Sequence, residues 1–130
     1  MKILLDTNAY SELRRGHPGV ADWVRRSEQV GMSLIVVGEL IYGFYRGSRL
    51  KQNLHDLNRF LDSPFVSILP MTMVTADRFG RIALQLRNKG TPIPTNDIWI
   101  AAQAQEMGAD LLSFDLHFKK IDGLAWIHPE

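Results

Sequence analysis

Four acidic side chains occupy positions at which α/β proteins bind ligands: Asp6, Glu39, Asp97 and Asp115. Asp6, Glu39 and Asp115 each follow an apolar segment that is predicted to be a buried strand, and Asp97 lies in the first turn of a predicted helix. Open α/β sheets bind ligands beyond the carboxyl ends of their strands. We therefore expect these four carboxylates to meet at one edge of a sheet.

Carboxylates that meet in this way must be neutralised by protons, by Lys or Arg, or by a metal cation. At about 4 Å and an effective dielectric constant near 20, each pair repels by roughly 4 kcal/mol. The chain has no cysteine, and ligation by oxygen alone favours Mg²⁺ or Mn²⁺ over zinc. Two such ions about 3.5–4 Å apart can bind both the attacking and the leaving oxygen of a phosphoryl displacement. The residue types therefore predict metal-dependent phosphoryl chemistry.

Each acid taken alone also has a purely structural explanation. Asp97 and Glu39 could complement the dipole of the helix that each one begins, and Asp115 could stabilise a turn. Asp6 is harder to explain in this way, because an acid that directly follows a buried apolar run needs a partner. It is the expected convergence of all four, rather than any single position, that supports a metal site.

The elements that must position these acids alternate between strand and helix along the whole chain. Apolar runs, several of them rich in β-branched residues, predict strands at 3–5, 33–37, 65–69, 111–114 and 125–128. Apolar residues at helical spacing, with caps and glycine terminators, predict helices at 9–14, 18–30, 38–46, 49–61, 73–89 and 95–107. This order predicts one three-layer α/β/α domain over residues 1–130, with a central parallel sheet of about five strands.

The composition fits such a domain and excludes several other classes of protein. A chain of 130 residues, 45% of them hydrophobic and 22% charged, can form one core and is too apolar for disorder. No apolar run approaches the roughly 20 residues that span a bilayer, and no secretory signal is recognisable, so we expect a cytoplasmic protein. The net charge is +1, but if four of the fourteen acids line a site, fifteen basic residues face the remaining ten. Such a surface suits a polyanionic substrate.

Around the four acids the chain resembles the PIN-domain nucleases, and specifically the VapC-type toxins of toxin–antitoxin pairs. Four short motifs carry the resemblance, in the order and at the spacing usual for that family, over nearly the whole chain. They are Leu5-Asp6-Thr7-Asn8, then Val37-Gly38-Glu39-Leu40-Ile41-Tyr42-Gly43 with Gly47-Ser48-Arg49, then Pro94-Thr95-Asn96-Asp97-Ile98-Trp99-Ile100-Ala101-Ala102, and finally Leu112-Ser113-Phe114-Asp115 with Phe118. Each motif alone is unspecific, but the four together are a strong indication.

The resemblance implies a five-stranded parallel sheet and endonucleolytic cleavage of RNA with Mg²⁺ or Mn²⁺. By this analogy Asp6, Asp97 and Asp115 are expected to bind the metal directly, and Glu39 is a further ligand or positions the attacking water. Supporting roles, with turn and cap chemistry as the alternative for the two asparagines, are expected for Thr7, Asn8, Asn96 and Ser113. Only the resemblance implies two protein partners, a cognate antitoxin and a second copy of the chain in a homodimer.

Basic residues close in sequence to the first two acids could bind RNA phosphates on either side of the scissile bond. They are Arg14, Arg15, Arg46 and Arg49, and a solvated helix face is the alternative explanation for them. An aromatic group, Tyr42, Phe44 and Tyr45, could serve an interface, but aromatic residues at helical spacing are more often buried, so we expect them in the core. His117 is the histidine closest in sequence to the acids, and the pattern assigns it no role.

Other functions are less consistent with these residues. Haloacid-dehalogenase-type phosphatases also have an acid after the first strand, but they place a second Asp two residues later, where this chain has Asn8. A phosphate-loop nucleotide hydrolase is excluded, because the chain has no Gly-x-x-x-x-Gly-Lys-Ser/Thr motif. The alternative to a nuclease is a non-catalytic module of the same fold that binds RNA or a partner, and the presence of all four acids argues against it.

Overall fold

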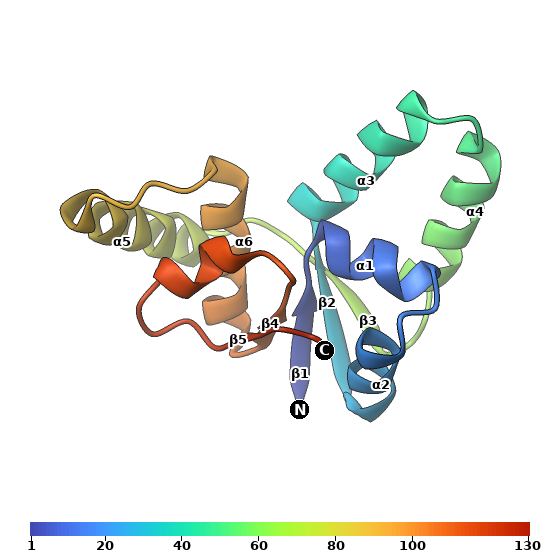
Figure 1. Cartoon of the computed structure of the whole chain (residues 1–130), viewed down its shortest axis with the longest axis horizontal. Helices are drawn as coiled ribbons and strands as arrows, with labels where there is room; N and C mark the ends of the chain where they lie inside the picture. The colour runs from blue at the N-terminus through green and yellow to red at the C-terminus, as the bar shows by residue number, and fades with distance from the viewer.

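The computed structural model describes all 130 residues and contains one five-stranded, all-parallel sheet in the order β3-β2-β1-β4-β5 (Figure 1). The strands are β1 (Lys2–Leu5), β2 (Gln29–Ser33), β3 (Val66–Leu69), β4 (Asp110–Leu112) and β5 (Trp126–Ile127). The helices are α1 (Thr7–Arg14), α2 (Pro18–Arg26), α3 (Leu34–Arg46), α4 (Leu50–Leu61), α5 (Met73–Lys89), α6 (Thr95–Met107) and the short 3₁₀ helix η1 (Leu116–Lys120). Figure 1 shows α1 to α4 on one side of the sheet and α5, α6 and η1 on the other, which confirms the predicted three-layer fold. No helix combines the length and apolar character needed to cross a membrane.

The register of the central strands determines which residues meet at the carboxyl edge of the sheet. β1 lies between β2 and β4, and Leu5 at its end pairs with Leu112 at the end of β4. The next residue of each strand is therefore Asp6 on one side and Ser113 on the other. These two positions are 107 residues apart in sequence, yet their side chains are hydrogen-bonded.

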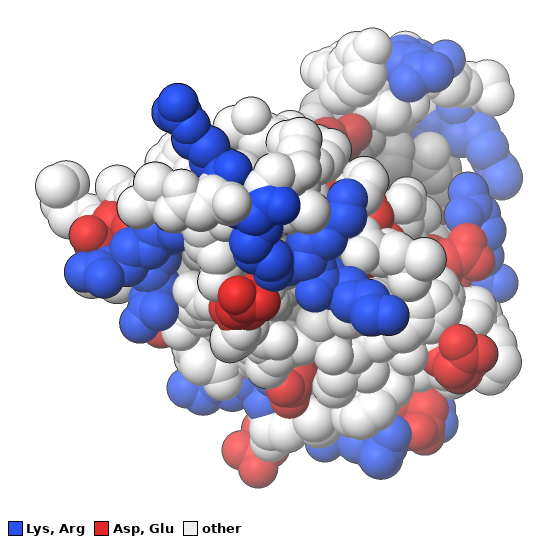
Figure 2. Space-filling model, turned by 60° about the vertical axis from the view of Figure 1, so that its left-hand side comes forward, with Lys and Arg blue, Asp and Glu red and all other residues white.

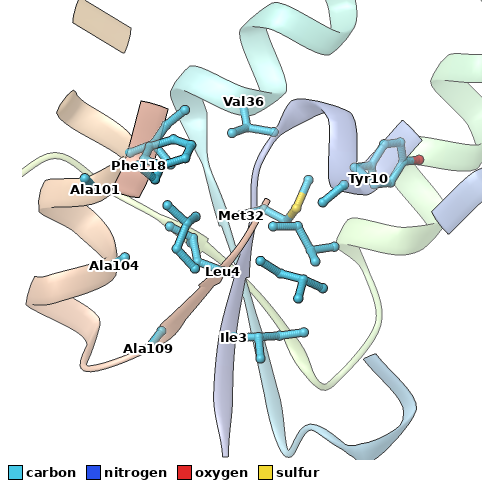
Figure 3. Packing of buried hydrophobic residues seen from close by; sticks show 14 of the residues in the cluster. Ile3, Leu4, Tyr10, Met32, Val36, Ala101, Ala104, Ala109 and Phe118 are labelled. Carbon is cyan, nitrogen blue, oxygen red and sulfur yellow. The ribbon is translucent and has the colours of Figure 1, made fainter. Parts of the chain in front are cut away.

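The core surrounds the middle strands and extends into α6. Ile3, Leu4 and Leu5 have no exposed surface. Figure 3 shows Ala101 and Ala104 of α6 on the side of the helix that faces this cluster. Small side chains allow the helix to approach the strands closely, because little volume separates the backbones. The packing of α6 fixes its first turn, which carries Asp97, close to the carboxyl edge of the sheet.

The boundary between the second strand and the next helix differs from the prediction. The predicted strand at 33–37 is wrong, because β2 ends at Ser33 and residues 34–37 form the first turn of α3. The Ser33 Oγ atom accepts a hydrogen bond of 3.0 Å from the Ile35 N–H, so this side chain caps the helix. The cap and the surrounding packing outweigh the strand preference of the β-branched residues that follow. Glu39 consequently lies in the second turn of α3. The sequence had indicated that it directly follows a strand, and this is wrong.

The predicted helix at 18–30 is also too long, because α2 ends at Arg26 and Val30 lies in β2. Gly31 does not terminate a helix but lies inside this strand. A Cβ atom at this position would be 2.7 Å from Met107 Sδ and 2.9 Å from Leu4 Cδ1. The absence of a side chain at Gly31 thus permits the close approach of the end of α6 to the sheet.

Candidate active site

A pocket of about 550 Å³ opens at the carboxyl edge of the sheet, and all four predicted acids line it. Three of the predicted supporting residues, Thr7, Asn8 and Asn96, line the same pocket. The fourth, Ser113, is completely buried beneath it. No Lys or Arg is among the lining residues. The structure therefore brings the predicted acids together without a Lys or Arg side chain to neutralise them.

Asp6 follows β1 and caps α1, and it is buried with only 6% of its surface exposed. Its Oδ1 atom accepts a hydrogen bond of 2.9 Å from the Ala9 N–H, and its Oδ2 atom accepts one from the Ser113 hydroxyl. Burial raises the pKa of Asp6 from 3.8 to about 6, although both hydrogen bonds oppose this rise. The negative charges of Asp97 and Asp115 raise it further. This carboxylate is thus ionised at neutral pH but poorly compensated.

Asp97 lies in the first turn of α6 and is partly buried in the same pocket. Burial is the largest cause that raises its pKa, and the nearby charges of Asp115 and Glu39 add to the effect. A hydrogen bond with His117 opposes the rise. Placement at a helix N-terminus favours the charged form, so the raised pKa of Asp97 shows that burial, together with the neighbouring acids, outweighs this effect.

Asp115 is the third residue after the end of β4 and caps η1 through its side chain. Its Oδ1 atom accepts a hydrogen bond of 2.9 Å from the His117 N–H. The backbone N–H of Asp115 in turn donates to the Ser113 Oγ atom at 2.9 Å. Ser113 therefore connects Asp6 to Asp115, and the indole N–H of Trp126 in β5 holds the Ser113 carbonyl at 3.0 Å. The two ends of the chain are joined beneath the pocket by these contacts.

Glu39 reaches the pocket from α3, on the opposite side of the sheet from α6 (Figure 1). Its Oε1 atom accepts a hydrogen bond of 2.6 Å from the Thr7 hydroxyl, and its Oε2 atom accepts one of 3.2 Å from the Asn96 amide. Thr7 and Asn96 thus orient this carboxylate from both sides. Asn8 lines the pocket and makes no side-chain hydrogen bond to the acids.

His117 is a residue of this site that the sequence analysis did not select. Its Nδ1 atom is 3.0 Å from Asp115 Oδ1 and 3.3 Å from Asp97 Oδ2. The only sequence feature that points to it is its position two residues after Asp115. The tight turn of η1 is what folds the ring back toward the acids, and spacing alone does not predict such a turn.

A second pocket of about 590 Å³ is continuous with the first, because Thr7 and Glu39 line both of them. Three of the four predicted phosphate-binding residues, Arg14, Arg15 and Arg49, line this second pocket. Arg14 is paired with Asp56 at 3.3 Å and Arg15 with Glu12 at 2.7 Å. We call this basic extension of the site, which also includes Gln52 and Asn53, the arginine groove.

Arg46, the fourth of these arginines, lies outside both pockets, with its guanidinium group 5.4 Å from the centre of the Tyr42 ring. The expectation that the nearby aromatic residues are buried is wrong for Tyr42 and Tyr45, which are 64% and 67% exposed. Phe44 does pack against the core, as expected. The end of α3 therefore presents two tyrosines to its surroundings.

Further basic side chains gather on the face that carries α5 and η1, with acidic side chains among them (Figure 2). Lys119 and Lys120 are exposed on η1, as expected of a solvated helix face. Lys89, at the end of α5, donates to Asp122 Oδ1 at 2.9 Å and to the Lys120 carbonyl at 2.8 Å. These contacts fasten the segment after η1 to α5, which helps to fix the position of His117.

A parallel sheet with a pocket of acids at its carboxyl edge defines the class to which this molecule belongs. Residues 3–124 match the model of the PIN domain family, and the chain belongs to that family. Within it, the chain is of the VapC type. Ribonuclease VapC2 of Haemophilus influenzae is 32% identical over 127 residues, which cover 95% of this chain and 95% of that protein. Ribonuclease VapC1 of the same species is 28% identical over 131 residues, which cover 97% of this chain and 96% of that protein.

Solved structures agree with this classification. VapBC2 of Rickettsia felis, bound to a DNA fragment from its promoter, has a chain with a TM-score of 0.86 and 27% identity over 98% of both chains. VapBC-1 of nontypeable Haemophilus influenzae gives a TM-score of 0.86 and 28% identity over 98% of this chain and 97% of that chain. FitAcB of Neisseria gonorrhoeae gives a TM-score of 0.80 and 30% identity over 98% of this chain and 97% of that chain.

Proposed function

We propose that this chain is a metal-dependent endoribonuclease in which Asp6, Glu39, Asp97 and Asp115 hold Mg²⁺ or Mn²⁺ at the scissile phosphate. The observation that carries the proposal is the convergence of four carboxylates on one pocket that no Lys or Arg lines. Relatives that are named ribonucleases match nearly the full length of the chain, which supports RNA as the substrate.

The side chains of the pocket fit a divalent cation. The carboxylates of Asp6 and Asp97 have raised pKa values because they are buried beside other acids, and a bound cation would remove this repulsion. The lining offers carboxylate, hydroxyl and amide oxygens, which are the ligands that Mg²⁺ and Mn²⁺ prefer. A bound divalent ion supplies charge stabilisation at the phosphate and a more acidic water.

The positions and hydrogen bonds of the acids suggest which of them bind the metal directly and which one orients the attacking water. Asp6, Asp97 and Asp115 approach from β1, α6 and the end of β4 and are proposed as direct ligands. Glu39 is held by Thr7 and Asn96, so it is suited to orient the attacking water or to complete the ligand set. Four carboxylates suffice for two ions, the arrangement used for in-line displacement at phosphorus.

The arginine groove is the proposed path for the RNA strand as it leaves the site. Arg14, Arg15 and Arg49 lie along it, and the groove meets the acids at Thr7 and Glu39. Guanidinium groups bind phosphates at two points and so position a backbone. The side-chain amides of Gln52 and Asn53 in the same groove offer donors and acceptors to an unpaired base.

The test is cleavage of total RNA by the purified protein. With Mg²⁺ or Mn²⁺ present we expect internal cleavage, and we expect none with EDTA. Asp6→Asn and Asp97→Asn should each reduce the rate by about a thousandfold, because each removes several kcal/mol of charge stabilisation. Asp62→Asn, a matched change of an exposed acid at the end of α4, should leave the rate unchanged. Cleavage that persists in EDTA would refute the metal mechanism, and an inactive wild type would favour the non-catalytic module.

We propose an antitoxin and a second copy of this chain as its protein partners. The similar solved structures include VapBC of Rickettsia felis and of Haemophilus influenzae. The exposed Tyr42 and Tyr45 of α3 are available for such contacts. We expect a protein encoded next to this one to co-purify with it and to block RNA cleavage. Light scattering of the isolated chain should give the mass of a dimer, and a monomer would exclude the homodimer.

A further inference from the structure

His117 lies in η1 beside two of the acids that line the pocket, Asp97 and Asp115. Its Nδ1 atom is 3.0 Å from Asp115 Oδ1 and 3.3 Å from Asp97 Oδ2. Each of these three residues offers one ligand atom, and the three atoms lie within 4.8 Å of one another. We propose that His117 is a nitrogen ligand of the metal site and makes it prefer Mn²⁺ to Mg²⁺. This inference rests on the proposed function, because it requires a cation among the acids.

The spacing of His117 Nδ1 from each of the two carboxylate oxygens suits neighbouring ligands of one ion. In a six-coordinate site with bonds of about 2.1 Å, adjacent ligand atoms are about 3.0 Å apart, because their bonds are at right angles. The two distances from Nδ1, 3.0 Å and 3.3 Å, match this edge length. Little rearrangement is therefore needed for the imidazole and the two carboxylates to bind the same cation.

The backbone holds the imidazole in this position. The His117 N–H donates to Asp115 Oδ1 at 2.9 Å, so the cap of η1 joins the two residues. The next residue, Phe118, is 1% exposed and anchors η1 in the core, where Figure 3 shows it beside α6. The side chain of His117 itself is 43% exposed, so its replacement does not disturb the core. These contacts hold the ring against Asp97 and Asp115 at the margin of the pocket.

A nitrogen ligand changes which ion the site favours. Mg²⁺ binds oxygen almost exclusively and loses its water molecules reluctantly, whereas transition ions such as Mn²⁺ accept imidazole more readily. A site of carboxylates alone discriminates weakly between these two ions. When Nδ1 takes the place of one oxygen, binding of Mn²⁺ is stabilised relative to binding of Mg²⁺.

The same distances also suit a simpler role, in which His117 only donates a hydrogen bond to Asp97 and Asp115. Outer partners of this kind orient the ligands, and their loss weakens metal binding by about 10- to 100-fold. Such a loss would affect Mg²⁺ and Mn²⁺ alike. The two roles therefore differ in the ratio of the two affinities and in whether a histidine nitrogen is bonded to the ion.

The experiment combines metal titration with electron spin-echo spectroscopy of the Mn²⁺-loaded full chain. We expect nitrogen modulation from a bound imidazole in the wild type, and its loss in His117→Asn, which keeps a hydrogen-bond donor but has no free nitrogen lone pair. The ratio of the Mn²⁺ and Mg²⁺ affinities should fall about tenfold or more in His117→Asn, if direct ligation is worth at least as much as an outer contact. His55→Asn, at an exposed histidine of α4, is the matched control and should behave as the wild type.

The outcomes separate this inference from the function on which it rests. Mn²⁺ that binds without nitrogen modulation, and a ratio of affinities that is the same in His117→Asn, would overturn the role of His117 and leave the metal-dependent nuclease intact. A wild type that binds neither ion would overturn both. Asp97→Asn provides the reference for a damaged site, because it should lose affinity for both ions.

Discussion

Asp6 is the only one of the four acids that is fully buried, and its environment explains both its use and its disadvantage. Two hydrogen bonds fix its oxygens, one from the Ala9 N–H and one from the Ser113 hydroxyl. Neither brings a positive charge, and the acids that share the pocket add repulsion. In the absence of a cation, the ionised side chain therefore destabilises the folded state.

Because the ionised Asp6 destabilises the metal-free protein, its contribution to the stability of the fold should depend on pH. The pKa of Asp6 is about 6 in the folded protein and 3.8 when unperturbed, so the unfolded chain loses its proton first as the pH rises. With EDTA present, the contribution of Asp6 to stability should be most favourable below about pH 4, fall between about pH 4 and 6, and then level off. Asp6→Asn removes this loss and should stabilise the metal-free protein at pH 7.5 by roughly 3 kcal/mol, with almost no effect at pH 4.

Urea denaturation at several pH values measures this difference. Addition of Mg²⁺ should stabilise the wild type and not Asp6→Asn, because only the native site binds the ion. A variant that is less stable than the wild type at pH 7.5 in EDTA would show that the hydrogen bonds of the carboxylate outweigh its burial.

Asp6, Asp97 and Asp115 could be predicted from the sequence because strand ends and a helix start mark them. Glu39 joins them in one pocket, although the strand predicted to precede it is wrong. His117 could not be predicted. Its approach to Asp97 depends on how η1 turns after Asp115, and this turn is set by tertiary contacts such as the buried Phe118. Likewise, the link from Ser113 to Asp6 depends on the pairing of β1 with β4, which local patterns do not specify.

At the level of the elements, the alternation of strands and helices was predicted, and both boundaries of β2 were misplaced. Residues 29–37 contain two conflicting preferences, since the β-branched residues after Ser33 favour a strand while Ser33 itself favours a helix start. The packing of Gly31 against α6 places the strand before Ser33. For this reason Glu39 reaches the site from within α3, although its position at the pocket was anticipated.

The close approach at Gly31 is a contact that can be tested. Gly31→Ala should destabilise the protein by about 1–3 kcal/mol, because the new Cβ atom would overlap with Met107 Sδ and Leu4 Cδ1. Met107→Ala in the same chain should recover part of this loss, so that the two changes are not additive. Gly80→Ala in α5, where no atom lies within 4 Å, is the control and should be neutral or stabilising. Full additivity in urea denaturation would show that α6 and β2 do not constrain each other here.

At the level of the whole molecule, charge is divided between an acidic pocket and its basic surroundings. The net charge of +1 conceals this division. The arginine groove begins where the acids end, so a polyanion can be held by its flanking phosphates while one phosphate enters the acidic pocket. A cation bound in the pocket would offset the negative charge of the acids, so that both the pocket and the arginine groove could attract phosphates.

This division predicts how salt affects RNA binding. In an Asp97→Asn background, which should prevent cleavage, Arg14→Ala and Arg49→Ala should each weaken binding of single-stranded RNA and lower the slope of log K against log salt by about 0.7. Arg81→Ala removes an exposed arginine that is paired with Asp77 on α5, and it serves as the control. Fluorescence anisotropy at several salt concentrations gives the slopes. If the slope of log K against log salt is the same for all variants, the RNA does not bind along the arginine groove.

The hydrogen bond between Asp6 and Ser113 also has a consequence for synthesis on the ribosome. Asp6 emerges early, but Ser113 follows 107 residues later, and the indole of Trp126 that holds Ser113 comes later still. A nascent chain that has not yet released β4 displays Asp6 without Ser113 or Asp115. The acidic pocket is therefore complete only when translation is nearly finished, which leaves time for the proposed antitoxin to be present first.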